Sequence, residues 1–137
     1  MIINGENLIL GRLASIVAKK ALLGEKIDIV NADKVVVVGS KRIVEAKYTQ
    51  KRNRTTPVKG PFISRMADRF VRRAIRDMLP YKKERGREAF ERIMCHIGVP
   101  DNFKNEKIET LDNVNVLNTS NIQFITIEKI CKLIGRQ

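Results

Sequence analysis

Cysteine and histidine are both scarce in this chain of 137 residues. It has two cysteines, Cys95 and Cys131, and one histidine, His96. Two cysteines cannot form a disulfide framework, and one histidine with two distant cysteines fits no zinc-ligand spacing. We expect both cysteines to be small buried apolar side chains in a reducing compartment. Cys95 and His96 are neighbours, but consecutive side chains of a strand point to opposite faces and cannot form a catalytic pair.

Long apolar runs are also missing. No stretch approaches the roughly 18 apolar residues that a transmembrane helix requires, and the first six residues lack the basic and apolar parts of a signal peptide. A soluble, cytoplasmic protein without membrane contact is therefore expected. Aromatic residues make up only 5% of the chain, which argues against a platform on which single-stranded bases stack.

Glycine-rich phosphate loops are a third missing feature. Gly11 and Gly24 stand alone, without the G-x-G-x-x-G pattern of a dinucleotide-binding fold. Gly39-Ser40-Lys41 lacks the upstream glycine and the residue order of a P-loop. Turns and helix caps explain these glycines better. The sequence thus predicts no catalytic residue, cofactor, metal or small-molecule substrate, although an α/β enzyme that uses a nucleotide stays open as an alternative.

Positive charge is what the sequence has in excess. Lysine and arginine number 27 against 15 aspartates and glutamates, which gives a net charge of +12. Residues 41–92 hold 17 of the basic and 6 of the acidic residues, while the rest of the chain is nearly neutral. Such a concentrated charge predicts a polyanionic partner, and nucleic acid is the favoured one.

Alternating strand and helix patterns predict the fold class. Apolar, β-branched runs predict strands at 2–3, 27–30, 35–38, 93–97 and 123–125, and helical periodicity predicts helices at 12–23, 41–51, 64–79, 87–92 and 127–134. Strand, helix and strand over the first thirty residues form the crossover unit of a parallel sheet. We therefore predict one α/β domain over residues 1–137, in three α/β/α layers around a mainly parallel sheet of about four strands. Residues 101–121 show no clear pattern.

The predicted helix at 64–79 carries the sharpest functional pattern. Its apolar residues form one stripe, and five arginines recur on the opposite side: Arg65, Arg69, Arg72, Arg73 and Arg76. The planar guanidinium group binds phosphate with two hydrogen bonds and stacks on unpaired bases. Only Asp68 and Asp77 are close enough in sequence to pair with them, so most of these arginines are expected to meet an external anion.

Two basic segments flank this helix and complete the candidate RNA-binding set. The loop at 53–61 is expected to be irregular and extended, and the segment at 81–87 to be flexible. The candidates outside the helix are Lys51, Arg52, Arg54, Lys59, Lys82, Lys83, Arg85 and Arg87. Gly60 and Gly86 are expected to let the backbone approach phosphate. This arrangement suits folded RNA, recognised by its backbone and shape. A DNA-binding protein would share the charge, but no helix–turn–helix or zinc pattern is present.

The segment around residue 80 resembles a known protein family. Ile75-Arg76-Asp77-Met78-Leu79-Pro80, followed five residues later by Gly86-Arg87, resembles the signature of the thirteenth protein of the large ribosomal subunit. Two earlier landmarks of that family are matched by Leu10-Gly11-Arg12-Leu13-Ala14-Ser15 and by Val30-Asn31-Ala32-Asp33-Lys34 with Val38-Gly39. Lys59-Gly60-Pro61-Phe62 and Gly98-Val99-Pro100 are similar to its archaeal and eukaryotic branch.

This resemblance implies a parallel four-stranded α/β core, no catalytic activity and a role in early assembly of the large (50S) ribosomal subunit. It also implies contacts with large-subunit ribosomal RNA and with neighbouring ribosomal proteins. The signature corresponds here to Met78, Leu79, Pro80, Gly86 and Arg87, and the basic residues near it to Arg72, Arg73, Arg76, Lys82, Lys83 and Arg85. If the arginine side of the predicted helix matters most for binding, glutamate at both Arg72 and Arg76 is expected to leave the fold intact but to prevent incorporation into the subunit.

Overall fold

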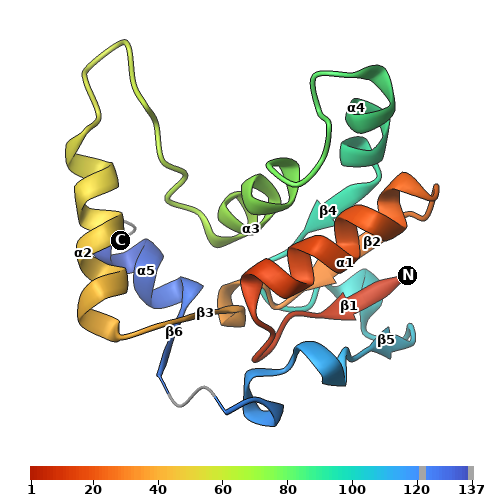
Figure 1. Cartoon of the computed structure of the whole chain (residues 1–137). Coiled ribbons are helices and arrows are strands. Elements are labelled where there is room, and N and C mark those ends of the chain that lie inside the picture. Colours follow the sequence, from red (N-terminus) through yellow and green to blue (C-terminus); the bar gives the residue numbers. More distant parts are fainter. Residues whose placement is uncertain (121–122, 136–137) are drawn as a thin grey trace.

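A four-stranded parallel sheet lies at the centre of the computed structural model, which describes residues 1–120 and 123–135 (Figure 1). Its order is β4–β2–β1–β5, with β1 at Ile2–Asn4, β2 at Ile27–Val30, β4 at Ile93–Cys95 and β5 at Ile108–Glu109. Ile3 lies opposite Ile29, which in turn lies opposite Cys95. Ile3 and Ile29 are fully buried. The predicted α/β class with a mainly parallel sheet of about four strands is confirmed.

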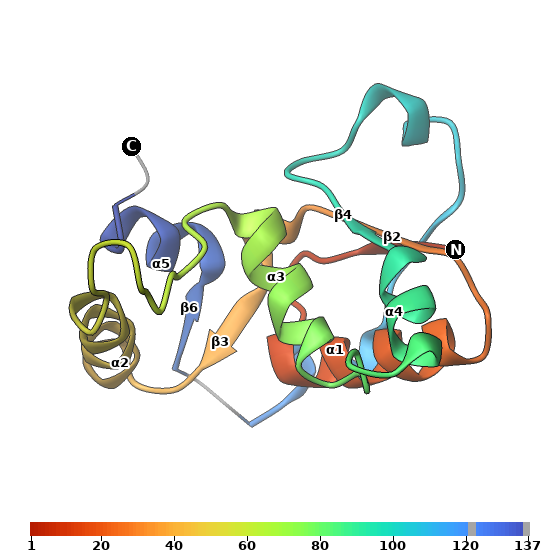
Figure 2. The same ribbon diagram turned by 90° about the horizontal axis from the view of Figure 1, so that it is seen from above.

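Three helices pack on one face of this sheet: α1 (Leu10–Leu22), α3 (Ala67–Arg76) and α4 (Glu84–Glu91). The connections from β1 to β2 and from β2 to β4 run in the same direction across the sheet. Because parallel crossovers are right-handed, both connections place their helices on the same face. The chain returns from β4 to β5 over the other face, where the short 3₁₀ helix η2 (Asp101–Phe103) forms part of a thinner layer (Figure 2).

A second sheet of two strands lies beside the first. In it β3 (Val36–Val38) pairs antiparallel with β6 (Phe124–Thr126). The valine run was expected to be a strand buried on both faces; it is a strand, but Val37 and Val38 are partly exposed because β3 belongs to this narrow ribbon. The helices α2 (Lys41–Asn53) and α5 (Ile127–Leu133) lie against the ribbon (Figure 1).

One hydrophobic cluster joins the two sheets and their helices. It includes fully buried residues of α1, α3 and α5: Leu13, Val17, Val71, Ile75, Ile127 and Ile130. Cys95 and Cys131 belong to the same cluster as buried thiols, in agreement with the expected role of small apolar side chains. No charged side chain in the described part of the chain is fully buried. The charge therefore lies around this core, at the surface.

Several elements differ from their predicted ranges. The helix expected at 64–79 is shorter at both ends, and α4 begins at Glu84 instead of residue 87. Arg85 and Arg87 therefore lie on a helix, and the prediction of a flexible segment there is wrong. Within 101–120, β5 and the 3₁₀ helices η2, η3 (Asp112–Val114) and η4 (Val116–Asn118) were not predicted, and residue 121 lies outside the described residues. None of the described helices has the length and apolar character that crossing a membrane demands.

Gly86 is buried where α4 meets the turn that follows α3. A Cβ atom at this position would lie 2.1 Å from the carbonyl oxygen of Pro80 and 2.8 Å from the backbone nitrogen of Tyr81. Both neighbours are backbone atoms, which cannot rotate away. Gly86 is therefore required by packing inside the protein, and the expectation that it brings the backbone close to phosphate is wrong.

Gly86→Ala is expected to lower the free energy of unfolding by about 1–3 kcal/mol, the usual cost of overpacking. Gly11→Ala in α1 is the matched control, since no atom beyond the adjacent backbone of α1 itself lies within 4 Å of a Cβ placed there. Alanine favours the helix, so this control is expected to be neutral or stabilised by up to about 1 kcal/mol. Urea unfolding followed by circular dichroism measures both variants, and equal stabilities would contradict the role given to Gly86.

Candidate nucleic-acid interface

The basic stretch 41–92 is built from α2, the loop at 54–66, α3 and α4. Figure 1 shows α2 and the protruding loop on one side, α4 on the other, and α3 between them at the base. Val71 and Ile75 of α3 are fully buried toward α1 and the sheet, whereas Arg69 and Arg73 are exposed on the opposite side. The prediction of a two-sided helix is confirmed for the apolar side and for these two arginines, whereas Arg72 and Arg76 are only half-exposed and Arg65 lies before the helix. Arg65 precedes α3 and lines a small cavity with Phe62 and Ile134.

Two of the five arginines stack on aromatic rings of the protein itself. The Cζ atom of Arg72 lies 4.3 Å from the ring centre of Phe90, and that of Arg76 lies 4.9 Å from the ring centre of Tyr81. Arg76 also pairs with Asp77, with 3.6 Å between Nη2 and Oδ1. The Nε atoms of both arginines are buried. Arg72 and Arg76 therefore brace α3 against the turn and α4, a role that sequence reasoning did not foresee.

Arg73 joins α3 to the protruding loop. Its Nη1 atom donates a hydrogen bond of 2.6 Å to the carbonyl oxygen of Phe62. Within the loop, Thr56 and Gly60 exchange two backbone hydrogen bonds of 3.2 and 3.0 Å. The loop was expected to be irregular and extended; the structure shows a tight turn fastened to α3. Lys59 is exposed in this turn.

Lys51 and Arg52, near the end of α2, point in different directions. Lys51 places its Nζ atom 5.4 Å from the ring centre of Tyr48. Arg52 donates a hydrogen bond of 3.4 Å from Nη1 to the carbonyl oxygen of Leu133, so it faces α5. Arg54 caps the C-terminal end of α2, directly after Asn53. Successive helical residues diverge in this way because each is rotated by about 100° from the last.

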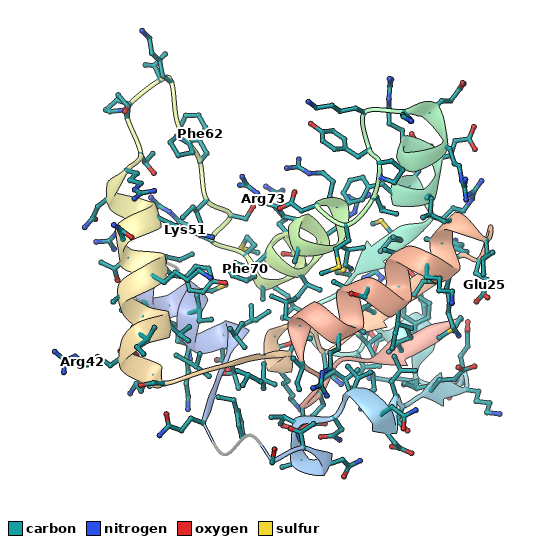
Figure 3. The ribbon with its side chains drawn as sticks, viewed as in Figure 1. Glu25, Arg42, Lys51, Phe62, Phe70 and Arg73 are labelled. Atoms are coloured by element: carbon teal, nitrogen blue, oxygen red, sulfur yellow. The ribbon has the colours of Figure 1, made fainter. Side chains whose placement is uncertain are left out.

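A cavity of about 340 Å³ brings together three of the predicted residues, namely Lys51, Arg54 and Arg73. We call it the α2–α3 cavity. Figure 3 shows Lys51, Phe70 and Arg73 around the space between the two helices. Sequence reasoning could not place these residues together, because α2 and α3 approach each other only through tertiary packing.

The remaining predicted residues lie on the other side of α3. Lys82, Lys83, Arg85 and Arg87 are all exposed, on the turn after α3 and on α4. Arg85 shares a shallow cavity with Lys19 of α1, which sequence reasoning missed because Lys19 lies outside the basic stretch.

Most of the predicted residues have no carboxylate partner. Among the thirteen, and within the described chain, Arg76 alone forms an ion pair. We call these thirteen residues together the basic surface. Its charge is not neutralised by the protein, so an external anion would be stabilised there.

Catalytic chemistry finds little support in the geometry of Cys95 and His96. Burial is the main cause that raises the pKa of the Cys95 thiol to about 12, so the nucleophilic thiolate is absent near neutral pH. The Nε2 atom of His96 lies 3.2 Å from Oδ1 of Asp28, on the other face of the sheet from the helices. Within residues 1–120 and 123–135, histidine, cysteine and carboxylate side chains form no group that could hold a metal.

The stacking of Arg72 predicts a measurable cost when it is removed. Arg72→Gln is expected to lower the free energy of unfolding by about 1 kcal/mol, because it ends the cation–π contact with Phe90. Arg69→Gln removes the same charge from the same helix at an exposed position, so it is the matched control and is expected to change little. Chemical unfolding of the RNA-free protein compares the two. If Arg69→Gln cost as much as Arg72→Gln, the bracing role would be refuted. The glutamate pair at Arg72 and Arg76 is accordingly expected to destabilise the fold as well.

Comparison with known proteins agrees with the predicted resemblance. The family model "Ribosomal protein L13" matches residues 1–102. The chain is similar to proteins named large ribosomal subunit protein uL13 from three archaea. Identity is 43% over 133 residues in Picrophilus torridus (97% of this chain and 95% of the relative) and 42% over 140 residues in Methanococcus maripaludis (98% and 97%). In Methanopyrus kandleri it is 38% over 138 residues (99% and 87%). The chain belongs to the ribosomal protein L13 family.

Proposed function

We propose that this protein is a structural constituent of the large ribosomal subunit and binds large-subunit ribosomal RNA through its basic surface. The observation that carries the proposal is the unpaired charge of that surface, where twelve of thirteen basic side chains lack a carboxylate partner in the described chain. The names of the relatives, all large-subunit proteins, favour ribosomal RNA over DNA. A cytoplasmic place on the ribosome, contacts with neighbouring ribosomal proteins and a role in early assembly belong to the same proposal.

The residues of the basic surface have two different roles in binding. Exposed groups such as Arg69, Lys82 and Arg85 are available to phosphate oxygens, whereas Arg72 and Arg76 hold the surface in shape. Arg73 is already oriented by its bond to Phe62. Groups that are held in place before binding lose less conformational entropy when RNA arrives. We further propose that residues 1–137 act as one domain, which the hydrophobic cluster shared by the two sheets supports.

Phosphate binding of this kind releases counterions and is therefore sensitive to salt. With six to ten phosphate contacts, affinity is expected to fall by roughly 10³–10⁵ between 50 and 200 mM salt, if folded RNA behaves like duplex DNA. Charge reversal tests which residues carry this effect. The triple variant Arg69→Glu, Lys82→Glu and Lys83→Glu is expected to reduce incorporation into large subunits at least tenfold.

The control variant carries Lys26→Glu, Lys107→Glu and Lys129→Glu, which change the net charge equally at exposed positions outside the basic surface. Tagged copies of both are expressed beside the untagged chain, and sucrose gradients measure the fraction that sediments with the large subunit. The control is expected to sediment like the wild type. Equal sedimentation of both triple variants would refute the proposed surface, and a wild-type chain found only among free proteins would refute the function.

A further inference from the structure

The α2–α3 cavity is lined by apolar as well as cationic side chains, although contacts with phosphate alone would require only cationic and polar ones. Below its basic rim of Lys51, Arg54 and Arg73, apolar side chains line it: Leu10, Tyr48, Pro61, Ile63, Phe70 and Ala74. A surface that only follows an RNA backbone needs cations and small polar groups. An apolar hollow among cations indicates a ligand that is apolar at one end and anionic at the other.

The rim of the cavity favours an anion. Three cationic side chains and one carboxylate, that of Asp77, line the cavity. Asp77 is partly neutralised by Arg76, whose Nη2 atom lies 3.6 Å from its Oδ1. Arg73 is fixed by its 2.6 Å hydrogen bond to Phe62, so its guanidinium group is held at the rim before any ligand binds. Phosphate is the anion that a guanidinium group and ammonium groups bind well.

The floor of the cavity is aromatic. The rings of Tyr48 and Phe70 pack against each other with 5.3 Å between their centres and 53° between their planes, so a base can stack on one of them but not on both. Phe70 is almost fully buried, so the floor is supported by the core and does not collapse into the hollow. Ser64 also lines the cavity. A volume of about 340 Å³ is near the lower end of the range for ligand pockets, roughly 300–1,000 Å³. It has room for one nucleotide but not for a helix of RNA.

We infer that the α2–α3 cavity receives a single unpaired nucleotide that is turned out of a helix of the large-subunit RNA. Its base lies on the apolar floor, and its phosphate lies against Lys51, Arg54 and Arg73. The inference rests on the proposed function, because the nucleotide belongs to the RNA that the basic surface binds. It also refines the expectation drawn from the scarcity of aromatic residues: the protein offers one hollow for one base, and no extended stacking platform.

Filling the cavity without changing its charge tests this inference. Ala74→Phe places a ring into the hollow from α3, and Ala46→Phe adds the same ring at an exposed position of α2 outside the cavity. Each variant is bound to a transcript of the large-subunit RNA, and chemical modification measures the reactivity of every unpaired base. The wild type and Ala46→Phe are expected to protect one unpaired base from modification.

In Ala74→Phe that base is expected to become reactive and the affinity to fall about tenfold, within the range of one stacked base. The dependence of affinity on salt is expected to weaken by no more than the loss of one phosphate contact, since the other phosphate contacts of the basic surface remain. Wild-type affinity and wild-type protection in a folded Ala74→Phe variant would overturn the inference. Circular dichroism checks the fold, and Ser64→Phe, which fills the cavity from the segment before α3, is used if Ala74→Phe does not fold.

Two further outcomes distinguish a failure of this inference from a failure of the proposed function. If the wild type fails to bind the transcript at all, the proposed function is overturned together with the inference. If the wild type binds and only Ala74→Phe is without effect, the inference fails alone. A mixture of adenosine, guanosine, cytidine and uridine monophosphates at millimolar concentration is expected neither to displace the RNA nor to stabilise the free protein against heat. Stabilisation by a mononucleotide, without a protected base in the RNA, would assign the cavity to a free nucleotide and overturn the inference.

Discussion

Burial of one side of α3 against α1 and the sheet determines where the positive charge of this protein lies. Val71 and Ile75 are completely excluded from solvent, which stabilises the fold by about 1.5–3 kcal/mol for each side chain. Repulsion between like charges one turn apart on a helix costs only a few tenths of a kcal/mol per pair. The apolar contacts therefore outweigh the repulsion among the arginines, and the helix keeps Arg69 and Arg73 together on the outer side.

Contacts with α3 hold the neighbouring basic segments in place. Arg73 fastens the protruding loop through the carbonyl oxygen of Phe62, and Arg72 and Arg76 reach the aromatic rings of Phe90 and Tyr81. On the same side, the absence of a side chain at Gly86 lets α4 approach the backbone of Pro80. Without these contacts the basic segments would move apart, because their like charges repel one another. Holding them in one arrangement also costs conformational entropy. The fold thus presents a preformed arrangement of cations to a partner.

The sequence predicts those parts of the fold that depend on local pattern. The strand at 27–30 and the apolar stripe of α3 are confirmed. Both could be predicted because each follows from apolar residues in a local sequence pattern. The strand β5 was missed because it has two residues, and its pairing with β1 is set by the rest of the sheet. The helix α4 was predicted to start at residue 87, but it begins at Glu84 and includes Gly86, where packing against the backbone of Pro80 leaves no room for a side chain.

The candidate site divides in the same way. Which residues carry charge follows from the sequence, and the exposure of Arg69 and Arg73 follows from the periodicity of α3. Which of them are free to bind does not follow, because the partners of Arg72 and Arg76 come from residues up to eighteen positions away or from the turn between the helices. The α2–α3 cavity likewise depends on contacts between α2, the loop and α3. Whether the thirteen residues bind RNA stays a prediction.

The central claim is that RNA is bound on the side formed by α2, the loop at 54–66, α3 and α4. Ultraviolet cross-linking of purified large subunits, followed by mass spectrometry of the peptides attached to RNA, tests it most directly. The account predicts that most cross-linked peptides of this protein come from residues 41–92, with few from residues 101–119. Cross-links concentrated in 101–119, with residues 41–92 free of them, would contradict it.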